Sequence, residues 1–301
     1  MADATENASA AALIGFGEAG QAFTKGWMEA GHGPFAAYDI KTDDPATAKA
    51  KRADYDRAGV RGADTPAQAL AGAELVFCLV TADRAREAAK AAALYLQPGA
   101  LFFDCNSCAP STKQGSAKII EATGGRYVDA AVMAPVHPKL HRTPVLVSGP
   151  HAEAGEKAMT ALSMAPRAVA GDVGAASSIK MIRSVMIKGL EALTLECVLS
   201  AVKAGVDQEV LASLDATFPQ FDWKSKSAYM MERAATHGVR RAAEMREVAL
   251  TVDDLGLGGQ MSRATAARQD EIGRLGVHAR EDEDYAALAR RLLDALSSDR
   301  E

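Results

Sequence analysis

Short apolar runs separated by helical patterns fill the first half of the chain. The runs are four to six residues long and end in glycine, proline or polar residues; they are Ala11–Ile14, Pro34–Tyr38, Leu75–Val80, Ala100–Asp104, Tyr127–Val132 and Val145–Gly149. The helical patterns between them include 82–96, 116–122 and 154–162. This alternation predicts a Rossmann-type, doubly wound parallel sheet, with Val145–Gly149 as a returning strand. Ligands of such a sheet bind at the carboxyl ends of its strands.

One long helix is predicted from Gly174 to Gly205. Its apolar residues recur three and four positions apart, and no proline interrupts it. Lys203 and Gly205 are typical of a helix C-terminus. At about 1.5 Å per residue, such a helix is longer than most domains need and usually joins two domains. We therefore expect a dinucleotide-binding domain over residues 1–173 and an all-α domain over residues 174–301.

Composition narrows the class of protein. The 301 residues are 48% hydrophobic, and the net charge of -5 gives no reason to expect a nucleic-acid or membrane partner. No apolar run approaches the roughly eighteen residues of a membrane span. Four cysteines form no disulfide framework, which favours a reducing cytoplasm. Residues 1–9 lack a basic cluster, so we expect a frayed tail and not a secretory signal.

A glycine-rich turn follows the first predicted strand. Gly15 would turn the chain, Gly17 would let the backbone approach a pyrophosphate, and Gly20 would let the next helix pack closely on the strand. The negative charge would then lie at a helix N-terminus. The whole turn is the candidate cofactor site, with residues Gly15, Phe16, Gly17, Glu18, Ala19 and Gly20.

Two further residues bear on the cofactor. Asp39 ends the second predicted strand, nineteen residues after Gly20, where a carboxylate accepts hydrogen bonds from a ribose and repels a 2'-phosphate. We therefore expect NAD in preference to NADP, although Lys41 nearby keeps NADP possible, and an ordinary turn residue is the alternative for Asp39. Thr81, at the end of a buried strand, would face the cofactor.

Polar residues follow the strand that ends at Asp104. Asn106 and Ser107 offer an amide and a hydroxyl that can bind a carboxylate without adding charge. Cys105 and Cys108 flank them, and a redox pair or half of a zinc site is the less favoured interpretation because no second such pair exists. We expect no metal site. His137 and His141, in a proline-rich loop, are weaker site candidates.

Lys180 lies near the start of the long helix, with Arg183 and Ser184 one turn further on. An ammonium partly removed from water beside another cation has a lowered pKa, which suits it to proton transfer. The alternative is a lysine whose stem lies on the helix while its head reaches solvent. Arg183 could clamp a carboxylate or phosphate, or could pair with an acid and play no chemical part.

Four motifs in order, GFGEAG, DCNSCAP, DAAVMAP and GAASSIK, resemble the β-hydroxyacid dehydrogenase family. This family includes 3-hydroxyisobutyrate and 6-phosphogluconate dehydrogenases. The resemblance implies that the glycine turn binds the dinucleotide, that the loop at Asn106 and Ser107 holds a substrate carboxylate, and that Lys180 is the general acid/base. It also implies a substrate contact from the loop of Met133 and Ala134, and a homodimer.

Several positions depart from the family pattern. Arg183 and Ser184 stand where the family usually has asparagine or glutamine, and Met133 and Ala134 stand where it has serine and glycine. The helical part after residue 206 is short, which resembles a bacterial and archaeal branch of the family, with His237 roughly where the family has a lysine near the nicotinamide. The substrate is therefore expected to differ from the well-known ones.

Together these patterns predict an NAD(P)-dependent dehydrogenase that transfers a hydride between the cofactor and a small 3-hydroxy acid or sugar acid. One alternative is an aldehyde or imine reductase that uses the same cofactor. Another is a protein that binds the dinucleotide as a sensor without catalysis.

Overall fold

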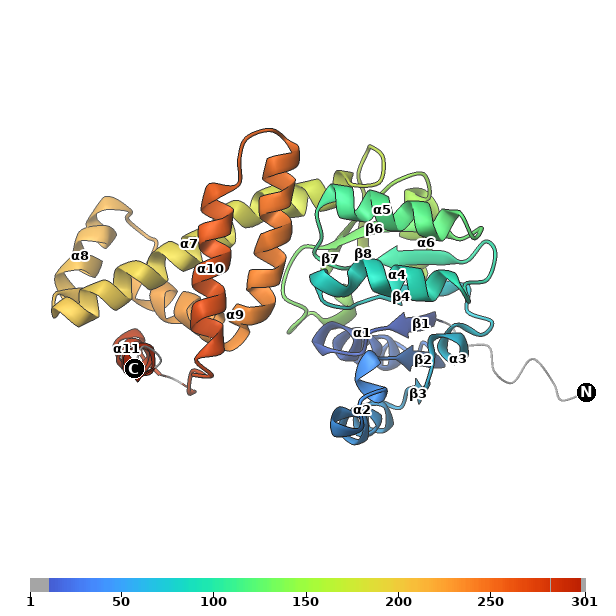
Figure 1. The fold of residues 1–301 in the computed structure, drawn as a ribbon, viewed down its shortest axis with the longest axis horizontal. Coiled ribbons are helices and arrows are strands. Elements are labelled where there is room, and N and C mark those ends of the chain that lie inside the picture. Colours follow the sequence, from blue (N-terminus) through green and yellow to red (C-terminus); the bar gives the residue numbers. More distant parts are fainter. Residues whose placement is uncertain (1–10, 282, 299–301) are drawn as a thin grey trace, which may run out of the picture. The chain divides into compact units, whose positions relative to one another are not determined.

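The computed structural model describes residues 11–281 and 283–298. It divides into two compact units, one up to Met181 and the other from Ile182, and the long helix α7 (Ala175–Ala204) contributes to both. The tail predicted for residues 1–9 lies outside the described residues. Each unit has its own apolar core. Figure 1 shows the strands gathered in the first unit and helices in the second.

The first unit is built on one eight-stranded sheet in the order β3-β2-β1-β4-β5-β6-β7-β8. The strands are β1 (Ala11–Ile14), β2 (Phe35–Tyr38), β3 (Arg61–Gly62), β4 (Leu75–Cys78), β5 (Leu101–Asp104), β6 (Arg126–Val132), β7 (Pro144–Ser148) and β8 (Ala165–Ala168). Strands β1 to β6 are parallel, β7 runs antiparallel to β6, and β8 is parallel to β7. The predicted Rossmann-type sheet and its returning strand are confirmed.

Helices cover both faces of this sheet (Figure 1). They are α1 (Glu18–Glu29), α2 (Pro45–Ala58), α3 (Pro66–Leu70), α4 (Ala85–Ala93), α5 (Pro110–Glu121) and α6 (Ala152–Ala161), with 3-10 turns η1 (Ile40–Thr42), η2 (Ala82–Arg84) and η3 (Leu140–Arg142). Neighbouring residues of β5 point to opposite faces: Phe103 packs in the cluster of α1 and α6, and Phe102 in the cluster of α4 and α5. Both faces are buried, as the continuous apolar strands predicted.

Some elements of this unit were not predicted. Helix α2 has few apolar residues, although Asp44 caps it and Pro45 opens it. Strand β3 is two residues long, and β8 contains Pro166, so neither shows an apolar run. Helix α5 begins at Pro110, six residues before the predicted start.

The second unit contains helices only. After the C-terminal part of α7 come α8 (Asp207–Thr217), α9 (Trp223–Asp254), α10 (Gln260–Arg274) and α11 (Tyr285–Ser298). Helices α9 and α10 form an antiparallel hairpin whose backbones touch: a Cβ atom on Gly238 would lie 2.7 Å from the Cα atom of Gly273. Only glycine permits this approach. None of the helices that the structure describes has the length and apolar character to cross a bilayer.

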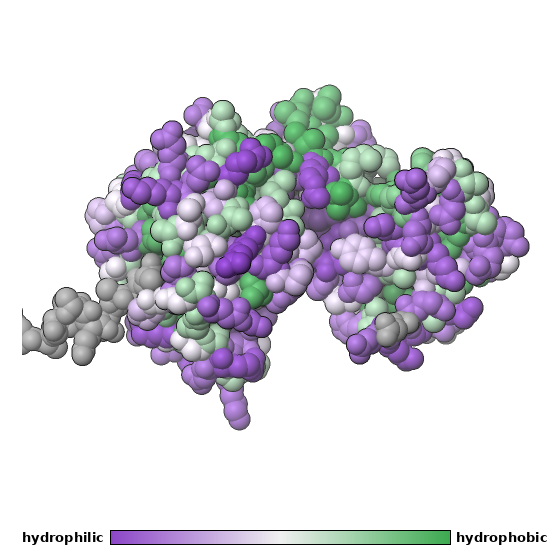
Figure 2. Space-filling model, turned by 180° about the vertical axis from the view of Figure 1, so that it is seen from behind, coloured by the Kyte–Doolittle hydropathy of each residue, from purple (hydrophilic) through white to green (hydrophobic). Residues whose placement is uncertain are grey.

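Ion pairs connect the α9–α10 hairpin to α7, and apolar side chains are exposed at its turn. Lys188 pairs with Glu244 and Glu191 with Arg241, so two ion pairs join α7 to α9 in the interior. By contrast, large apolar side chains are exposed at the turn between α9 and α10, which is green at the top of Figure 2; they are Leu255, Leu257 and Met261.

Candidate functional site

The glycine turn has the form that a dinucleotide requires. Gly15 has φ +91°, and a Cβ atom there would lie 2.6 Å from the carbonyl oxygen of Leu79, so this position must be glycine. A Cβ atom on Gly17 would meet no atom within 4 Å, which leaves open space before the N-terminus of α1. A Cβ atom on Gly20 would lie 3.0 Å from the Gly15 carbonyl oxygen. The space around each of the three glycines is therefore compatible with the purpose expected of it.

The other residues of the turn differ in exposure. Phe16 is buried, with its ring centroid 5.1 Å from that of Tyr55. Glu18 is exposed and opens α1, and Ala19 is half-buried. Backbone groups at the start of α1 are thus the part of the turn suited to an anion, because the exposed N-terminus of a helix carries partial positive charge.

Asp39 and the glycine turn are held together. The backbone N–H of Phe16 donates to Asp39 Oδ2 at 2.7 Å, and the backbone N–H of Lys41 donates to Asp39 Oδ1 at 3.0 Å. The other side of Phe16 is fixed by the buried Lys51, whose ammonium donates to the Phe16 carbonyl at 2.8 Å. The carboxylate expected at the ribose therefore also supports the backbone of the glycine turn. Lys51 was missed by the sequence analysis because it lies on the unpredicted helix α2.

Strands β4 and β5 end side by side, at Cys78 and Asp104. Thr81, just beyond β4, is exposed at the start of η2. Asn106 is buried: its Oδ1 accepts from the backbone N–H of Val80 at 2.7 Å, and its amide nitrogen donates to Asp104 Oδ1 at 2.7 Å and to Cys78 Sγ at 3.3 Å. Both amide hydrogens are thus used inside the protein. In this conformation Asn106 fixes the loop, whereas Ser107 is half-buried.

A buried polar cluster lies beneath this loop. The hydroxyl of Tyr127 donates to Asp104 Oδ2 at 2.7 Å, and the ammonium of Lys113 lies 3.0 Å from Asp104 Oδ1. The same ammonium lies 3.6 Å from Asp129 Oδ1. Burial acts to lower the pKa of Lys113, but the two carboxylates outweigh it and raise that pKa, so the lysine is charged. The sequence gives no signal for this cluster, because its members are distant along the chain.

Asp129 caps the helix that carries Lys180. Its Oδ2 accepts from the backbone N–H groups of Gly174 and Ser177, at 3.1 and 3.0 Å, and from the Ser177 hydroxyl at 3.1 Å. Ser148 adds a further bond to Oδ2 at 3.1 Å and accepts from the backbone N–H of Ala176 at 2.9 Å. A carboxylate is favourable at a helix N-terminus, where backbone donors lack partners within the helix. Asp129 belongs to the quoted motif DAAVMAP, but its role as a cap follows only from the fold.

Lys180 lies one turn after this cap. Its charge acts on the Cys105 thiol, whose pKa burial raises to about 12 against the opposing charges of Lys113 and Lys180. A Cβ atom on Gly174, just before α7, would lie 3.0 Å from Cβ of Pro110, so the end of the loop after β5 and the start of α7 are close together. Arg183 and Ser184 follow on α7 within one turn of Lys180, Arg183 exposed and Ser184 buried.

Three thiols lie in the loop after β5 or at the end of β4. Cys78 and Cys108 are buried, as is Cys105. Burial raises the pKa of Cys78 as well, so a thiolate is disfavoured there. Because thiolates are the nucleophiles and metal ligands, these pKa values support the earlier preference against a redox pair.

The loop after β6 contains Met133, Ala134 and the two histidines. Met133 is half-buried and packs beside Ala131, Leu146 and Ala176, while Ala134 is exposed. His137 is exposed, whereas His141 is buried against α1, where a Cβ atom on Gly26 would overlap its ring. His141 therefore packs in the fold, and burial lowers its pKa.

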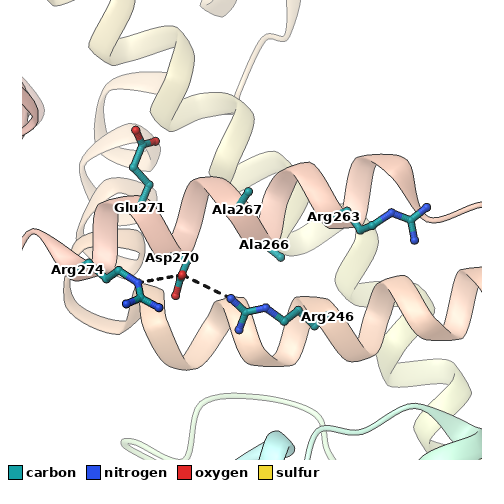
Figure 3. A pocket seen from close by; sticks show the side chains of 7 residues that line it. All are labelled: Arg246, Arg263, Ala266, Ala267, Asp270, Glu271 and Arg274. Carbon is teal, nitrogen blue, oxygen red and sulfur yellow. Dashed lines mark hydrogen bonds and ion pairs between the residues drawn. The ribbon is translucent and has the colours of Figure 1, made fainter. Parts of the chain in front are cut away.

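The second unit holds His237 and a surface groove. His237 lies half-buried on α9, next to the Gly238 crossing. A groove of about 560 Å³ between α9 and α10 is lined by three arginines, Arg246, Arg263 and Arg274, over Ala266 and Ala267 (Figure 3). Asp270 lies 3.5 Å from Arg246 and 2.9 Å from Arg274, and Asp253 lies 2.6 Å from Arg263. The guanidinium charges are thus matched by carboxylates, and the groove is a poor candidate for an anion site.

Two family profiles match the chain. Residues 10–174, more than half of the chain, match the NAD binding domain of 6-phosphogluconate dehydrogenase. Residues 201–272 match a domain of unknown function, DUF1932.

Known proteins are similar over most of the chain. A 3-hydroxyisobutyrate dehydrogenase of Pseudomonas aeruginosa is 27% identical over 251 residues, which are 76% of this chain and 81% of that relative. The structure of a conserved hypothetical protein of Sinorhizobium meliloti is 38% identical, with a TM-score of 0.70 and coverage of 95% of this chain and 96% of that chain.

More distant structures share the fold. The 3-hydroxyisobutyrate dehydrogenase of Mycobacterium tuberculosis, with L-serine, is 16% identical at a TM-score of 0.69, covering 95% of this chain and 99% of that one. A reductive aminase of Aspergillus terreus, in complex with NADPH4, cyclohexanone and allyl amine, is 18% identical at a TM-score of 0.55, covering 94% of this chain and 99% of that one. With the matched NAD-binding profile, the glycine turn and the α7 lysine, these likenesses show that the chain belongs to the β-hydroxyacid dehydrogenase family of NAD(P)-dependent oxidoreductases.

Proposed function

We propose that this oxidoreductase interconverts a small 3-hydroxy acid or sugar acid and its carbonyl product, with Lys180 as the general acid/base. The observation that carries the proposal is the position of Lys180: Asp129 caps its helix, and Gly174, just before that helix, lies against Pro110 at the end of the loop that bears Ser107. In a Rossmann sheet, the substrate and the bound dinucleotide meet at the carboxyl ends of the strands. A lysine beside a polar loop at this edge is therefore suited to proton transfer.

The residues of the glycine turn fit a nicotinamide dinucleotide. Gly17 leaves open space at the N-terminus of α1, and Gly15 allows the close approach of backbone that a Cβ atom would block. Asp39 would accept from the ribose hydroxyls, and its negative charge would repel a 2'-phosphate, so we propose NAD as the preferred cofactor. When bound, the nicotinamide supplies the hydride acceptor. Fluorescence titration with NADH and with NADPH tests this preference, and tighter binding of NADPH would contradict it.

The chain's own groups would bind and orient the substrate. The Ser107 hydroxyl would donate to the substrate carboxylate, while Asn106 holds the loop in place through its bonds to Val80 and Asp104. Arg183 and Ser184, within one turn of Lys180, and Met133 and Ala134, on the loop after β6, would add contacts that set specificity. Because these are the positions that depart from the family pattern, we propose a substrate different from 3-hydroxyisobutyrate.

Lys180 would move one proton in each direction. In oxidation its neutral amine accepts the proton of the alcohol while the hydride leaves the carbinol carbon; in reduction its ammonium returns that proton to the oxygen. Position matters as much as basicity, since the amine must lie within hydrogen-bond reach of the substrate oxygen.

The direct test is a panel of small hydroxy acids and sugar acids, some phosphorylated, followed by the formation of NADH and NADPH. A phosphorylated substrate would identify Arg183 as its binding group. The fold shared with a reductive aminase keeps reduction of an aldehyde or imine as a second candidate. Oxidation of NADH or NADPH by carbonyl compounds, with and without an amine, distinguishes the two. Cofactor binding with no turnover in either assay would instead favour a sensor.

We also propose that the second unit forms a homodimer. Its exposed apolar residues at the α9–α10 turn, Leu255, Leu257 and Met261, are costly to leave in water. Sedimentation of wild type and of Leu257→Glu tests this surface. A dimer that becomes a monomer in the variant is expected, and a wild-type monomer would contradict it.

A further inference from the structure

A single buried lysine connects the loops of the candidate site. Lys113, on α5, has no exposed surface, and its ammonium lies 3.0 Å from Asp104 Oδ1 and 3.6 Å from Asp129 Oδ1. It also donates to the backbone carbonyl of Asp104 at 2.5 Å. Two carboxylates buried this deeply would be very costly without a cation between them. Lys113 therefore ties the end of β5 to β6.

The connection on one side leads to the substrate and cofactor loops. Asp104 Oδ1, which contacts Lys113, also accepts from the backbone N–H of Asn106 at 3.1 Å and from its side chain at 2.7 Å. Asn106 then accepts from the backbone N–H of Val80, next to Thr81. Three contacts in sequence, Lys113–Asp104, Asp104–Asn106 and Asn106–Val80, thus link the cation to the segment just after β4.

The connection on the other side leads to α7. Asp129 places Oδ1 toward Lys113 and Oδ2 on the first turn of α7, where it accepts from Gly174 and Ser177. Lys180 is three residues beyond Ser177. One carboxylate therefore joins the buried lysine to the turn before Lys180.

We propose that Lys113 is a positioning residue that holds the Ser107 loop and the Lys180 turn in register, and that its positive charge helps to set the pH at which Lys180 gives up its proton. This inference rests on the proposed role of Lys180. Nothing in it requires Lys113 to touch a ligand.

The charges around Lys113 make the second part of the proposal specific. The groups that act on it are Asp104 from β5, Asp129 from β6 and Cys108 from the loop after β5. Lys113 lies beside both Asp104 and Asp129, and Asp129 also caps the turn before Lys180, so the same carboxylate lies between the two lysines. Removal of the Lys113 charge leaves two carboxylates to act on Lys180, which favours its ammonium form. Removal of one carboxylate has the opposite effect.

The experiment measures the titration of Lys180 without a substrate. Acetic anhydride labels neutral amines, and cleavage after arginine then gives a peptide of residues 168–183, in which Lys180 is the one lysine. Its labelling is followed by mass spectrometry from pH 6 to pH 11 in wild type, Lys113→Met and Asp104→Asn. Lys118→Met is the matched control, because Lys118 is exposed on the same helix α5.

Opposite shifts are expected in the two test variants. The labelling midpoint of Lys180 should rise by about one pH unit in Lys113→Met and fall by a similar amount in Asp104→Asn, and should stay in place in Lys118→Met. A folded Lys113→Met with the wild-type midpoint, or shifts of the same sign in both variants, would overturn the proposal. If Lys113→Met does not fold, the labelling of Lys180 in Asp104→Asn tests the proposal alone. An unchanged midpoint in Asp104→Asn would then overturn the proposal.

The role proposed for Lys113 and the role proposed for Lys180 can fail independently, and the outcomes distinguish them. Unshifted midpoints together with loss of turnover in Lys180→Ala would reject the role of Lys113 and leave that of Lys180 standing. The expected shifts together with full turnover in Lys180→Ala would support the role of Lys113 in the titration of Lys180 and reject Lys180 as the general acid/base.

Discussion

Asp129 accepts a hydrogen bond from the backbone N–H of Ser177 at 3.0 Å, so a residue of the central sheet caps the helix on which Lys180 lies. Asp129→Ala should lower the free energy of unfolding by about 3–5 kcal/mol, because it also leaves Lys113 with one carboxylate. Ser148→Ala, which removes a weaker part of the same cap, should cost about 1–2 kcal/mol. Urea unfolding measures both. Equal costs would show that the carboxylate is not the main cap.

Substitutions at two glycines of the turn should affect folding and cofactor binding separately. Gly15→Ala should lower the free energy of unfolding by about 2–4 kcal/mol, because φ is +91° and Leu79 blocks the added carbon. Gly17→Ala should change stability by less than about 1 kcal/mol yet weaken NADH binding about tenfold or more, because its methyl group occupies the space before α1. Unfolding curves and NADH fluorescence report the two effects. Undiminished NADH binding in Gly17→Ala would place the pyrophosphate elsewhere.

These contrasts show what the sequence can predict. Local chemistry identified the glycine turn, since each glycine has a separate geometric purpose within six residues. Periodicity identified the long helix, because its apolar residues recur over thirty residues. Helix α2 lacks such a pattern, and only Asp44, Pro45 and Gly59 at its ends could have indicated it.

The candidate site was less accessible to prediction. Asn106 was selected for the chemistry of its amide, but its hydrogens are taken by Asp104 and Cys78, a fact that depends on strand pairing. Lys113 and Asp129 are sixteen residues apart and look like ordinary surface and strand residues in the sequence. Their pairing arises only when β5 and β6 lie side by side and α5 covers them. Long-range polar contacts of this kind have no local signature.

Substitutions at Gly189 and Gly238, two of the helical glycines of the second unit, should change stability in opposite directions. Gly238→Ala should destabilise the protein by about 3 kcal/mol, because the added carbon would overlap the backbone of α10 near Gly273. Gly189→Ala, on α7, meets only Thr265 at 3.9 Å and should stabilise the protein by about 0.5–1 kcal/mol through helix propensity. Chemical unfolding of each variant gives the sign. Stabilisation by Gly238→Ala would contradict the close crossing.

His141 should make stability depend on pH. Burial lowers its pKa in the folded state below the ordinary value of 6.5, so the unfolded chain binds a proton more readily. The contribution is present above pH 6.5 and is lost as the pH falls below that value toward the folded pKa. Urea unfolding at pH 8 and pH 5.5 should therefore show a smaller loss of stability in His141→Gln than in wild type. Equal losses would mean that other groups cause the pH dependence.

The most direct test of the account compares Lys180→Ala with Lys203→Ala, since Lys203 is exposed near the other end of α7. Turnover of the substrate found in the panel and the affinity for NADH are measured for both. The account predicts that Lys180→Ala loses about a hundredfold to ten-thousandfold in turnover with NADH affinity nearly unchanged, while Lys203→Ala behaves as wild type. Wild-type turnover in Lys180→Ala would contradict it.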